Sequence, residues 1–257
     1  MKRLLKIFIV VGVALMIAGG ICLGVGIKKD VFARNIVENS YTIEDDFNNI
    51  NIDSSISDIT IKVAEDDITT INTVEGEKYS INVSVVGDTL TIEDEHQGKW
   101  LDDLTFFSKS YSVAISLNRS TFNNINIKAS TGDVSIYDLN VDDIKIDLST
   151  GDIKLSSVRC NTLDIDASTG DIKLIDTISS ESLKIDVSTG DVVLDRFDSK
   201  DIYIKGSTGD VRGTILTDKV FDCHASTGSV KVPTSGETEE KCYIKVSTGD
   251  IKISIAQ

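Results

Sequence analysis

One short sequence word recurs along the second half of this 257-residue chain and limits what the chain can fold into. Ser-Thr-Gly-Asp occurs six times, and Ser-Thr-Gly-Ser occurs once, at 226–229. Successive glycines of this word are 19, 19, 20, 19, 19 and 21 residues apart, at Gly132, Gly151, Gly170, Gly190, Gly209, Gly228 and Gly249. A period near 20 residues that persists over seven copies predicts a stacked repeat architecture.

Apolar and polar residues alternate on both sides of the word. In the copy around Gly151, the apolar positions are Ile144, Ile146, Ile153 and Leu155. Alternation with a period of two is strand geometry, and no helical period competes with it. The apolar parity changes across the word, which a corner allows and a straight strand does not. We therefore expect an all-β fold, a β-solenoid whose coils of 19–21 residues each contain a strand, a corner, a strand and a loop.

The composition of the corner has a structural explanation. Glycine adopts positive φ without steric cost, and Ser, Thr and Asp side chains hydrogen-bond to nearby backbone in turns. Gly151→Val is expected to strain the bend by ~1 kcal/mol or more. Asp152→Asn is expected to be mild.

The chain divides into three parts in this interpretation. Residues 1–29 form a membrane anchor with a short cytoplasmic tail, 30–117 an irregular first half of the solenoid, and 118–257 the regular repeats. Residues 47–63 ("FNNINIDSSISDITIKV") echo 122–138 ("FNNINIKASTGDVSIYD"), with SSISD in place of the corner word. Further strands are expected at 68–74, 79–85, 89–93 and 111–117, and 94–110 is expected to be a loop.

Residues 7–27 are uncharged and long enough to cross a bilayer as a helix, since a helix rises ~1.5 Å per residue and the hydrocarbon layer is about 30 Å thick. We expect a transmembrane helix that remains uncleaved, because the apolar part of a signal peptide is shorter, roughly 7–15 residues. A cleaved signal is the alternative. The expected location is the cell membrane, single-pass, with the bulk of the chain extracellular.

Charge separates this anchor from the remainder. Residues 1–29 carry five basic residues and no acid, so the rest of the chain holds 21 basic and 41 acidic residues. Such an acidic domain repels nucleic acid and anionic lipid headgroups. The expected partners are the membrane through 7–27 and an unknown envelope protein or glycan.

A column of aspartates follows the corner glycines and is a candidate metal site. These residues are Asp133, Asp152, Asp171, Asp191, Asp210 and Asp250, with Ser229 interrupting the series. Carboxylates stacked at the ~4.8 Å strand spacing repel one another unless they are neutralised, and calcium takes 6–8 oxygen ligands. Each coil offers only one such carboxylate. The favoured interpretation is therefore a cap of the turn with surface charge pairs, and a calcium ladder is the alternative.

No arrangement for catalysis stands out. The two histidines are His96 and His224, and most Ser-Thr pairs have no histidine beside them. Asp147, Asp166 and Asp186 form an outward acidic column, which keeps a polysaccharide-acting enzyme as a distant alternative. We expect no enzymatic activity, no catalytic residue and no cofactor.

The cysteines and the C-terminus raise two questions about the end of the stack. Cys223 and Cys242 fall in inward columns of adjacent coils, offset so that free buried thiols are expected and a disulfide is the alternative. The final alternation "YIKVSTGDIKISIAQ" has no capping helix. Since an uncapped edge strand pairs readily, we expect possible self-association at a C-terminal solenoid edge.

Residues 41–257 resemble the bacterial putative-adhesin family, a domain of unknown function that includes the LiaG-like envelope proteins. The resemblance rests on "INIDSSISDITI", "YSVAISLNRSTFNNINIKASTGDVSI" and the serial corner words. The family often has Leu-Pro where this chain has Leu117-Asn118. The resemblance implies a membrane-anchored or secreted β-solenoid and no catalytic residues. The expected function is a non-enzymatic adhesin or envelope-binding protein; an accessory protein of an envelope-stress system, acting through a membrane-protein partner, is the alternative.

Overall fold

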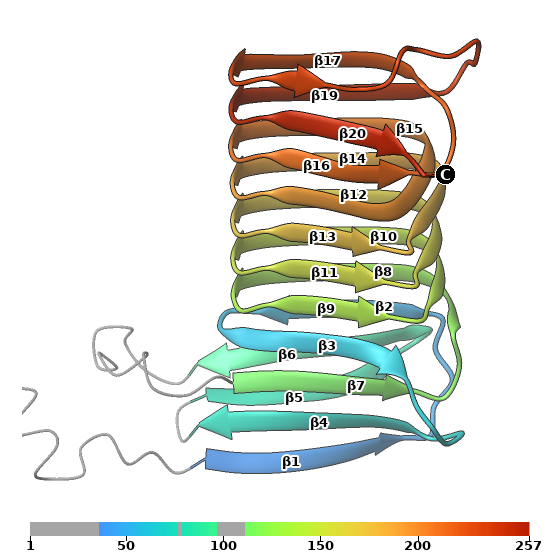
Figure 1. Ribbon diagram of the computed structural model, residues 1–257. Coiled ribbons are helices and arrows are strands. Elements are labelled where there is room, and N and C mark those ends of the chain that lie inside the picture. Colours follow the sequence, from blue (N-terminus) through green and yellow to red (C-terminus); the bar gives the residue numbers. More distant parts are fainter. Residues whose placement is uncertain (1–35, 77–78, 97–110, 257) are drawn as a thin grey trace, which may run out of the picture.

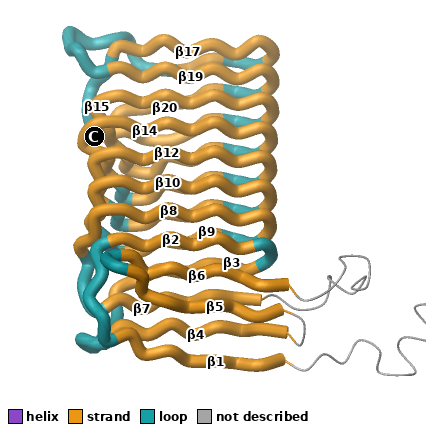
Figure 2. The backbone as a smooth tube through the Cα atoms, turned by 180° about the vertical axis from the view of Figure 1, so that it is seen from behind, coloured by secondary structure: helices purple, strands orange, loops and turns teal. Residues whose placement is uncertain are grey.

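The computed structural model describes residues 36–76, 79–96 and 111–256 (Figure 1). Within these residues 20 strands join into one hydrogen-bonded sheet system, and no helix occurs. The expected all-β class is confirmed. The strands wind into a stack of coils, as Figures 1 and 2 show from opposite sides.

Each regular coil contributes one long and one short strand to two different faces of the stack. The long strands pair in parallel, with Ile146 opposite both Ile127 and Ile165. They are β8 (Thr121–Thr131), β10 (Asn140–Thr150), β12 (Arg159–Thr169) and β14 (Ile178–Thr189). The short strands also pair in parallel and are β9 (Val134–Tyr137), β11 (Ile153–Ser156) and β13 (Ile172–Ile175). β15 (Val192–Thr208) continues both faces, because its first part pairs with β13 and its second part with β14.

The core lies between the two faces and repeats from coil to coil. In the coil around Gly151, the predicted inward residues Ile144, Ile146, Ile153 and Leu155 are all buried. Stacked strands repeat this set in register, so each apolar column is continuous along the stack. The parity change predicted at the corner is thereby confirmed.

In four coils a second turn lies six residues after the corner glycine. Its residues are not glycines, yet they have positive φ: Asp138 (57°), Ser157 (58°), Asp176 (47°) and Arg196 (51°). Asp and Ser hydrogen-bond locally and tolerate this region better than most residues. Arg196 instead binds the carboxylate of Asp176 with two nitrogens, at 2.6 and 2.5 Å.

The last two coils are stacked out of sequence order. β16 (Val211–Ile215) completes the coil that begins in β15, and the chain next forms β17 (Val220–Thr227) and β18 (Val230–Lys231). The C-terminal strands β19 (Lys241–Thr248) and β20 (Ile251–Ile255) then lie between these two coils: β19 pairs with β15 and β17, and β20 with β16 and β18. The expectation that the C-terminal strand forms the open edge is therefore wrong.

The exchanged order determines which coil is open on one side. β19 and β20 bury Cys242, Ile244 and Ile251, whereas the inward side chains of β17, such as Phe221 and Cys223, are only half-buried. The coil of β17 and β18 stands at the end, where its core side lacks a neighbouring coil. The loop after β18 partly covers the β17 edge, since the Phe221 amide donates to Ser235 Oγ at 2.9 Å. Covering an edge with a loop is a common protection against strand addition.

The first half contains one complete coil above a mostly antiparallel base. β2 (Asn49–Ser54) and β3 (Ser57–Val63) pair in parallel with β8 and β9, so the echo of 122–138 by 47–63 is a true coil. Below it, β6 (Thr89–His96) and β7 (Tyr111–Leu117) continue the two faces in parallel. β1 (Ile36–Ile43), β4 (Thr69–Gly76) and β5 (Tyr79–Val86) pair antiparallel and do not form solenoid coils, unlike the expected degenerate repeat.

The predicted anchor at 7–27, its alternative as a signal peptide and most of the predicted loop at 94–110 lie outside the described residues. Among the described residues, no helix is long and apolar enough to cross a membrane.

Candidate functional site

The corner glycines form a column in which each residue stands directly on the one before. All seven have φ between 128° and 146°. A Cβ atom built on Gly170 would lie 1.8 Å from the carbonyl oxygen of Gly151, and the other copies meet similar contacts. Glycine is thus required twice, by the backbone conformation and by the close approach of successive coils.

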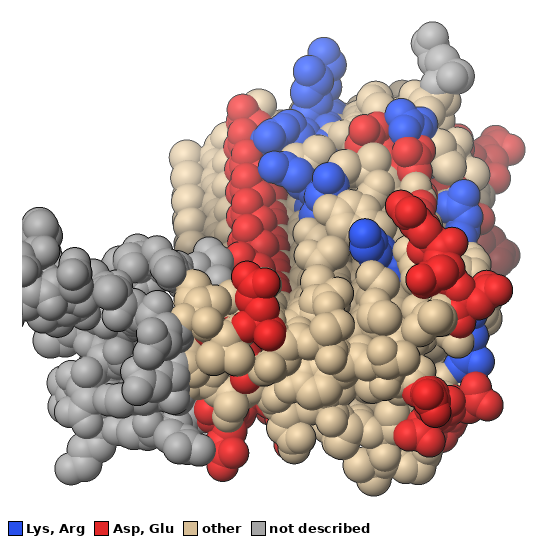
Figure 3. Space-filling model, turned by 90° about the horizontal axis from the view of Figure 1, so that it is seen from below, with Lys and Arg blue, Asp and Glu red and all other residues tan. Residues whose placement is uncertain are grey.

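The aspartates after these glycines hydrogen-bond from coil to coil. The amide of Asp152 donates to Oδ1 of Asp133 at 2.8 Å, and the amide of Asp171 donates to Oδ1 of Asp152 at 2.8 Å. The pattern continues through Asp191, Asp210 and Asp250. It starts at Asp58 of the SSISD corner, whose Oδ1 accepts from the Asp133 amide at 3.0 Å. We call these seven residues, from Asp58 to Asp250, the aspartate ladder, and Figure 3 shows acidic side chains in such a column.

The serine that interrupts the repeat ends the ladder. Ser229 lies in the outermost coil, and both its amide and its hydroxyl donate to Oδ1 of Asp250, at 2.7 and 2.9 Å. No further coil follows, so this position needs no carboxylate to accept from a next amide. The ladder order in space, with Asp250 before Ser229, follows the exchanged order of the last two coils.

The ladder caps amides of the neighbouring coil, and charge pairs contribute at one point. Among the described residues, the one ion pair to a ladder carboxylate joins Arg212 to Asp191 at 2.6 Å. Arg212 lowers the pKa of Asp191, with help from the Asp210 amide. The Ser229 amide and hydroxyl lower the pKa of Asp250. The described residues contain no group of three or more His, Cys, Asp or Glu side chains placed to hold a metal ion.

A groove runs along the stack beside the corner, and sequence analysis did not foresee it. It has a volume of about 820 Å³ and crosses the ends of the long strands from β2 to β19. Its floor is the main chain of inward-facing residues, including Ala129, Leu148, Ala167 and Val187, whose side chains are buried in the core. We call it the serine groove, because one wall is the first residue of the corner word in six coils: Ser130, Ser149, Ser168, Ser188, Ser207 and Ser247.

These six serines are exposed and unengaged. Their hydroxyl groups make no hydrogen bond or other polar contact to any group in the described part of the chain. A serine that supported the turn would bind backbone, so the expectation that serine stabilises the corner locally is wrong for these side chains. Their hydroxyls are instead available to a ligand.

The other wall of the serine groove is charged, and it contains the acidic column singled out in the sequence. Asp147, Asp166 and Asp186 line the groove together with Asp53, Lys128, Lys205 and Lys245. Lys184 lies two residues before Asp186 on β14. Its Nζ is 3.7 Å from Oδ1 of Asp166 and 3.3 Å from Oδ2 of Asp186. Lys184 thus pairs with two of the three carboxylates, and these keep further acceptor capacity toward the groove.

An aromatic pair adjoins this wall near the distal end. The rings of Tyr203 and Tyr243 stack with centroids 4.9 Å apart, and Lys205 Nζ lies 4.9 Å from the centroid of the Tyr203 ring. Both tyrosines lie two residues before a groove lysine on the same face of their strand. They come together only because β19 is inserted next to β15.

The remaining candidate residues do not form a reactive centre. His224 pairs with Asp222 at 2.7 Å on the outermost coil, and no hydrogen bond joins His224 to Ser226 within the described residues. Cys160 is buried, and burial raises the pKa of its thiol to about 11. Cys223 and Cys242 are free thiols, as expected, and the contact with Cys223 together with burial raises the pKa of Cys242. The side chain of His96 lies outside the description.

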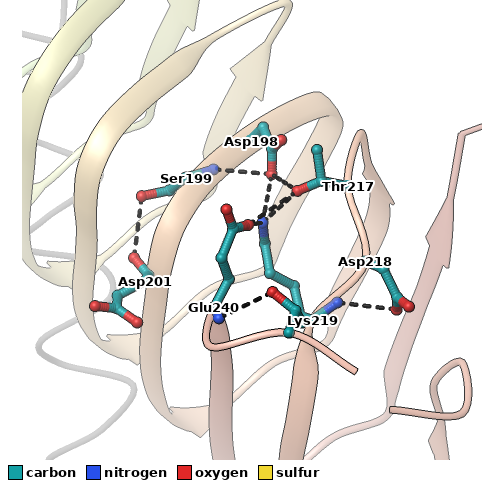
Figure 4. Close-up of polar contacts among 8 residues, drawn as sticks. Asp198, Ser199, Asp201, Thr217, Asp218, Lys219 and Glu240 are labelled. Carbon is teal, nitrogen blue, oxygen red and sulfur yellow. Dashed lines mark hydrogen bonds and ion pairs between the residues drawn. The ribbon is translucent and has the colours of Figure 1, made fainter. Parts of the chain in front are cut away.

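A fully buried lysine ties the exchanged coils together (Figure 4). Lys219 precedes β17, and its Nζ lies 3.0 Å from Oδ1 of Asp198 in β15. It also binds Thr217 and Glu240, the residue just before β19. This hydrogen bond from Lys219 lowers the pKa of Glu240. One ammonium thus joins three successive levels of the stack, which the sequence around Lys219 did not indicate.

Stacked parallel coils, a glycine corner and a lateral groove define a β-solenoid repeat domain whose accessible chemistry lies in its side chains. The chain belongs to the Toastrack DUF4097 family, whose model matches residues 47–257. This family resemblance, expected from the corner words, is confirmed.

The chain is similar to solved structures of two bacterial proteins. A putative adhesin from Bacteroides fragilis is 20% identical, with a TM-score of 0.57, over 86% of this chain and 98% of that chain. A putative cell adhesion protein from Clostridium sporogenes is 15% identical, with a TM-score of 0.40, over 86% of this chain and all of that chain (100%). None of the curated proteins compared with the chain matches it. The Bacteroides structure shows the shared fold.

Proposed function

We propose that this chain is a non-enzymatic binding protein, anchored in a bacterial cell membrane by residues 7–27, that presents its stack outside the cell to an envelope component. The observation that carries this proposal is the serine groove, a continuous lateral surface with unengaged hydroxyls over six coils. The described residues offer no comparable arrangement of nucleophile and base. Binding is therefore the activity that this surface supports best.

The position of the groove suits an anchored protein. β1 begins at Ile36, shortly after the uncharged segment, and it lies at the base of the stack in Figure 1. The coils that line the groove rise from this base toward β17. An anchor before β1 would therefore hold the groove upright and away from the bilayer. The acidic character of the chain after residue 29 accords with repulsion from anionic lipid headgroups.

Protease treatment of intact cells tests the location. The full-length chain with a C-terminal epitope tag should lose the tag when protease is added outside, while a cytoplasmic control protein stays intact. The chain should also remain with the membrane fraction after washing at high salt. A tag that stays protected until the cells are lysed would contradict the proposal, whatever the groove binds.

An accessory or regulatory role through a membrane-protein partner is the second candidate. The observation in its favour is β1, which among the described residues pairs with β4 alone and follows the proposed anchor in the sequence. Such an edge accepts a strand from a partner. Replacing residues 1–27 with an unrelated transmembrane segment separates the two roles: retained function supports the groove, and lost function supports contacts at the membrane.

A further inference from the structure

We infer that the serine groove binds a linear, uncharged, hydroxyl-rich polymer, a neutral glycan strand, that lies along the axis of the stack. This inference deepens the proposed function and rests on it, since it names the class of envelope component that the groove would take. Three properties of the groove support it: what its backbone cannot offer, how its charges balance, and how its hydroxyls repeat.

The groove recognises its ligand through side chains alone. It crosses strands β8, β10, β12 and β14, and each of these strands is paired on both sides. β8 pairs with β2 and β10, and the other three pair with the long strands of the neighbouring coils. The backbone hydrogen bonds between these strands therefore already use the main-chain groups that a peptide strand would need. Hydroxyls, carboxylates and ammonium groups remain, and these donate to and accept from sugar hydroxyls.

The charges of the groove favour a neutral ligand. Four acids and three lysines line it, so it is nearly balanced. A polyanion would lie against Asp147, Asp166 and Asp186, and a polycation would lie against Lys205 and Lys245 at the other end. Like charges held at such short range repel strongly, whereas a neutral polymer meets no penalty at either end.

The hydroxyls repeat with the coils and so favour a polymer over a single small molecule. Parallel strands lie ~4.8 Å apart, and each coil adds one serine at the same position. A ligand whose units repeat along its length can place one unit after another against successive serines. The floor between the two walls is main chain, because the side chains of Ala167 and Val187 are buried in the core, so the hydroxyl wall and the charged wall supply the contacts to the sugar units. Each added contact is intramolecular once the first has formed, so affinity should rise with chain length.

Isothermal titration of the full-length chain in detergent tests this inference. The probes are chito-oligosaccharides, from the dimer to the hexamer of N-acetylglucosamine, with hyaluronan as the polyanion and chitosan as the polycation. We expect the hexamer to bind about tenfold more tightly than the dimer, or better, and more tightly per chain than either charged polymer. Equal affinity for all lengths, or preference for a charged polymer, would overturn the inference.

Variants within the groove locate the binding. Asp166→Ala should weaken hexamer binding about tenfold, since it removes a carboxylate acceptor that a sugar hydroxyl would use. Ser168→Ala, a smaller change on the opposite wall, should weaken it severalfold. The control is Lys173→Ala, an exposed position on the short-strand face, which should leave affinity unchanged. Unchanged binding in both groove variants, with unchanged thermal unfolding, would place the ligand elsewhere and refute the inference.

Two outcomes separate this inference from the proposed function. If no neutral oligosaccharide binds while the chain is exposed outside the cell, the inference fails and the proposed location stands. If bound chito-oligosaccharide is recovered shortened, the chain is an enzyme and the non-enzymatic proposal fails even though the groove binds a glycan.

Discussion

Glycine at the corner is determined by contact as much as by conformation. Positive φ alone is tolerated by four non-glycine residues at the second turn of the coils. What distinguishes the corner is that a Cβ atom there would meet the backbone of the neighbouring coil at about 2 Å, which no rotamer change relieves. The sequence predicted the positive φ and that small residues let successive corners stack closely, but it did not show that a Cβ atom on the glycine itself would meet the neighbouring carbonyl.

Gly170→Ala should therefore destabilise the chain more than an ordinary left-handed glycine would. We expect a loss of ~3 kcal/mol or more in the free energy of unfolding, since strain and overpacking both contribute. Gly87→Ala is the matched control, because Gly87 has φ 63° and nothing within 4 Å of its added Cβ; it should lose ~1 kcal/mol. Urea unfolding of the full-length variants gives both values, and equal losses would contradict the contact argument.

Two substitutions in the aspartate ladder separate the loss of a hydrogen-bond acceptor from the loss of a charge. Asp152→Ala removes the acceptor for the Asp171 amide and should cost ~1 kcal/mol, whereas Asp152→Asn keeps an oxygen acceptor and should cost less. Urea unfolding measures both. Millimolar calcium should leave the melting temperature of the unmodified chain unchanged; a clear rise would support the calcium alternative over capping.

Acid should weaken the upper end of the ladder. Asp191 and Asp250 have lowered pKa values in the folded chain, through Arg212 and through the Ser229 amide respectively. A lowered pKa stabilises the fold above the unfolded value of about 4, and this contribution is lost as pH falls through the folded value. Unfolding between pH 6 and pH 3, taken as approximate limits, should show this loss. Asp250→Asn should reduce the slope, and an unchanged slope in both Asp250→Asn and Asp191→Asn would contradict the assignment.

At the scale of elements, the exchange of the last two coils gives the stack its end. The outermost coil combines a half-buried core side, a two-residue β18 and a serine in place of the ladder aspartate. The loop that follows, 232–240, contains Pro233 and covers part of the edge through Ser235. Lys219 links this end to the coils beneath it.

Lys219→Ala should destabilise this end selectively. Removing one partner of a buried ion pair leaves Asp198 without its counter-charge, and we expect a loss of ~3 kcal/mol. Hydrogen exchange should then rise in peptides covering 220–231 and 241–256 and stay unchanged in those covering 121–169. Lys200→Ala, an exposed lysine nearby, is the control. Uniform loss of protection along the whole stack would contradict the view that Lys219 holds one end.

How far the sequence predicted the elements depends on where the repeat is regular. The strands around each corner, the inward columns and the strand ranges before residue 117 follow from alternation alone. The exchanged coils could not be predicted, because each copy carries the same pattern and nothing in one sequence orders them. The changes at Ser229 and Pro233 were the available signals, and they become informative only when an end coil is known to differ from an inner one. The groove was missed for a related reason: Ser149 and its equivalents looked like turn residues until their neighbours across coils were known.

At the scale of the whole molecule, frame and binding surface are separate parts of one repeat. Within a single coil, Asp171 belongs to the aspartate ladder and Asp166, five residues earlier, belongs to the serine groove. The first holds coils together, and the second faces the space where the ligand is proposed to lie. The repeat therefore generates a long binding surface at the same time as the structure that supports it.

The most direct test of this separation compares two variants of the full-length chain, Asp166→Asn and Asp171→Asn, in their affinity for the chito-oligosaccharide hexamer. We predict that Asp166→Asn weakens binding severalfold or more with an unchanged melting temperature. Asp171→Asn should bind as the unmodified chain does, with at most a lower melting temperature. Loss of binding in Asp171→Asn with full binding in Asp166→Asn would contradict the account and place the binding site at the corner itself.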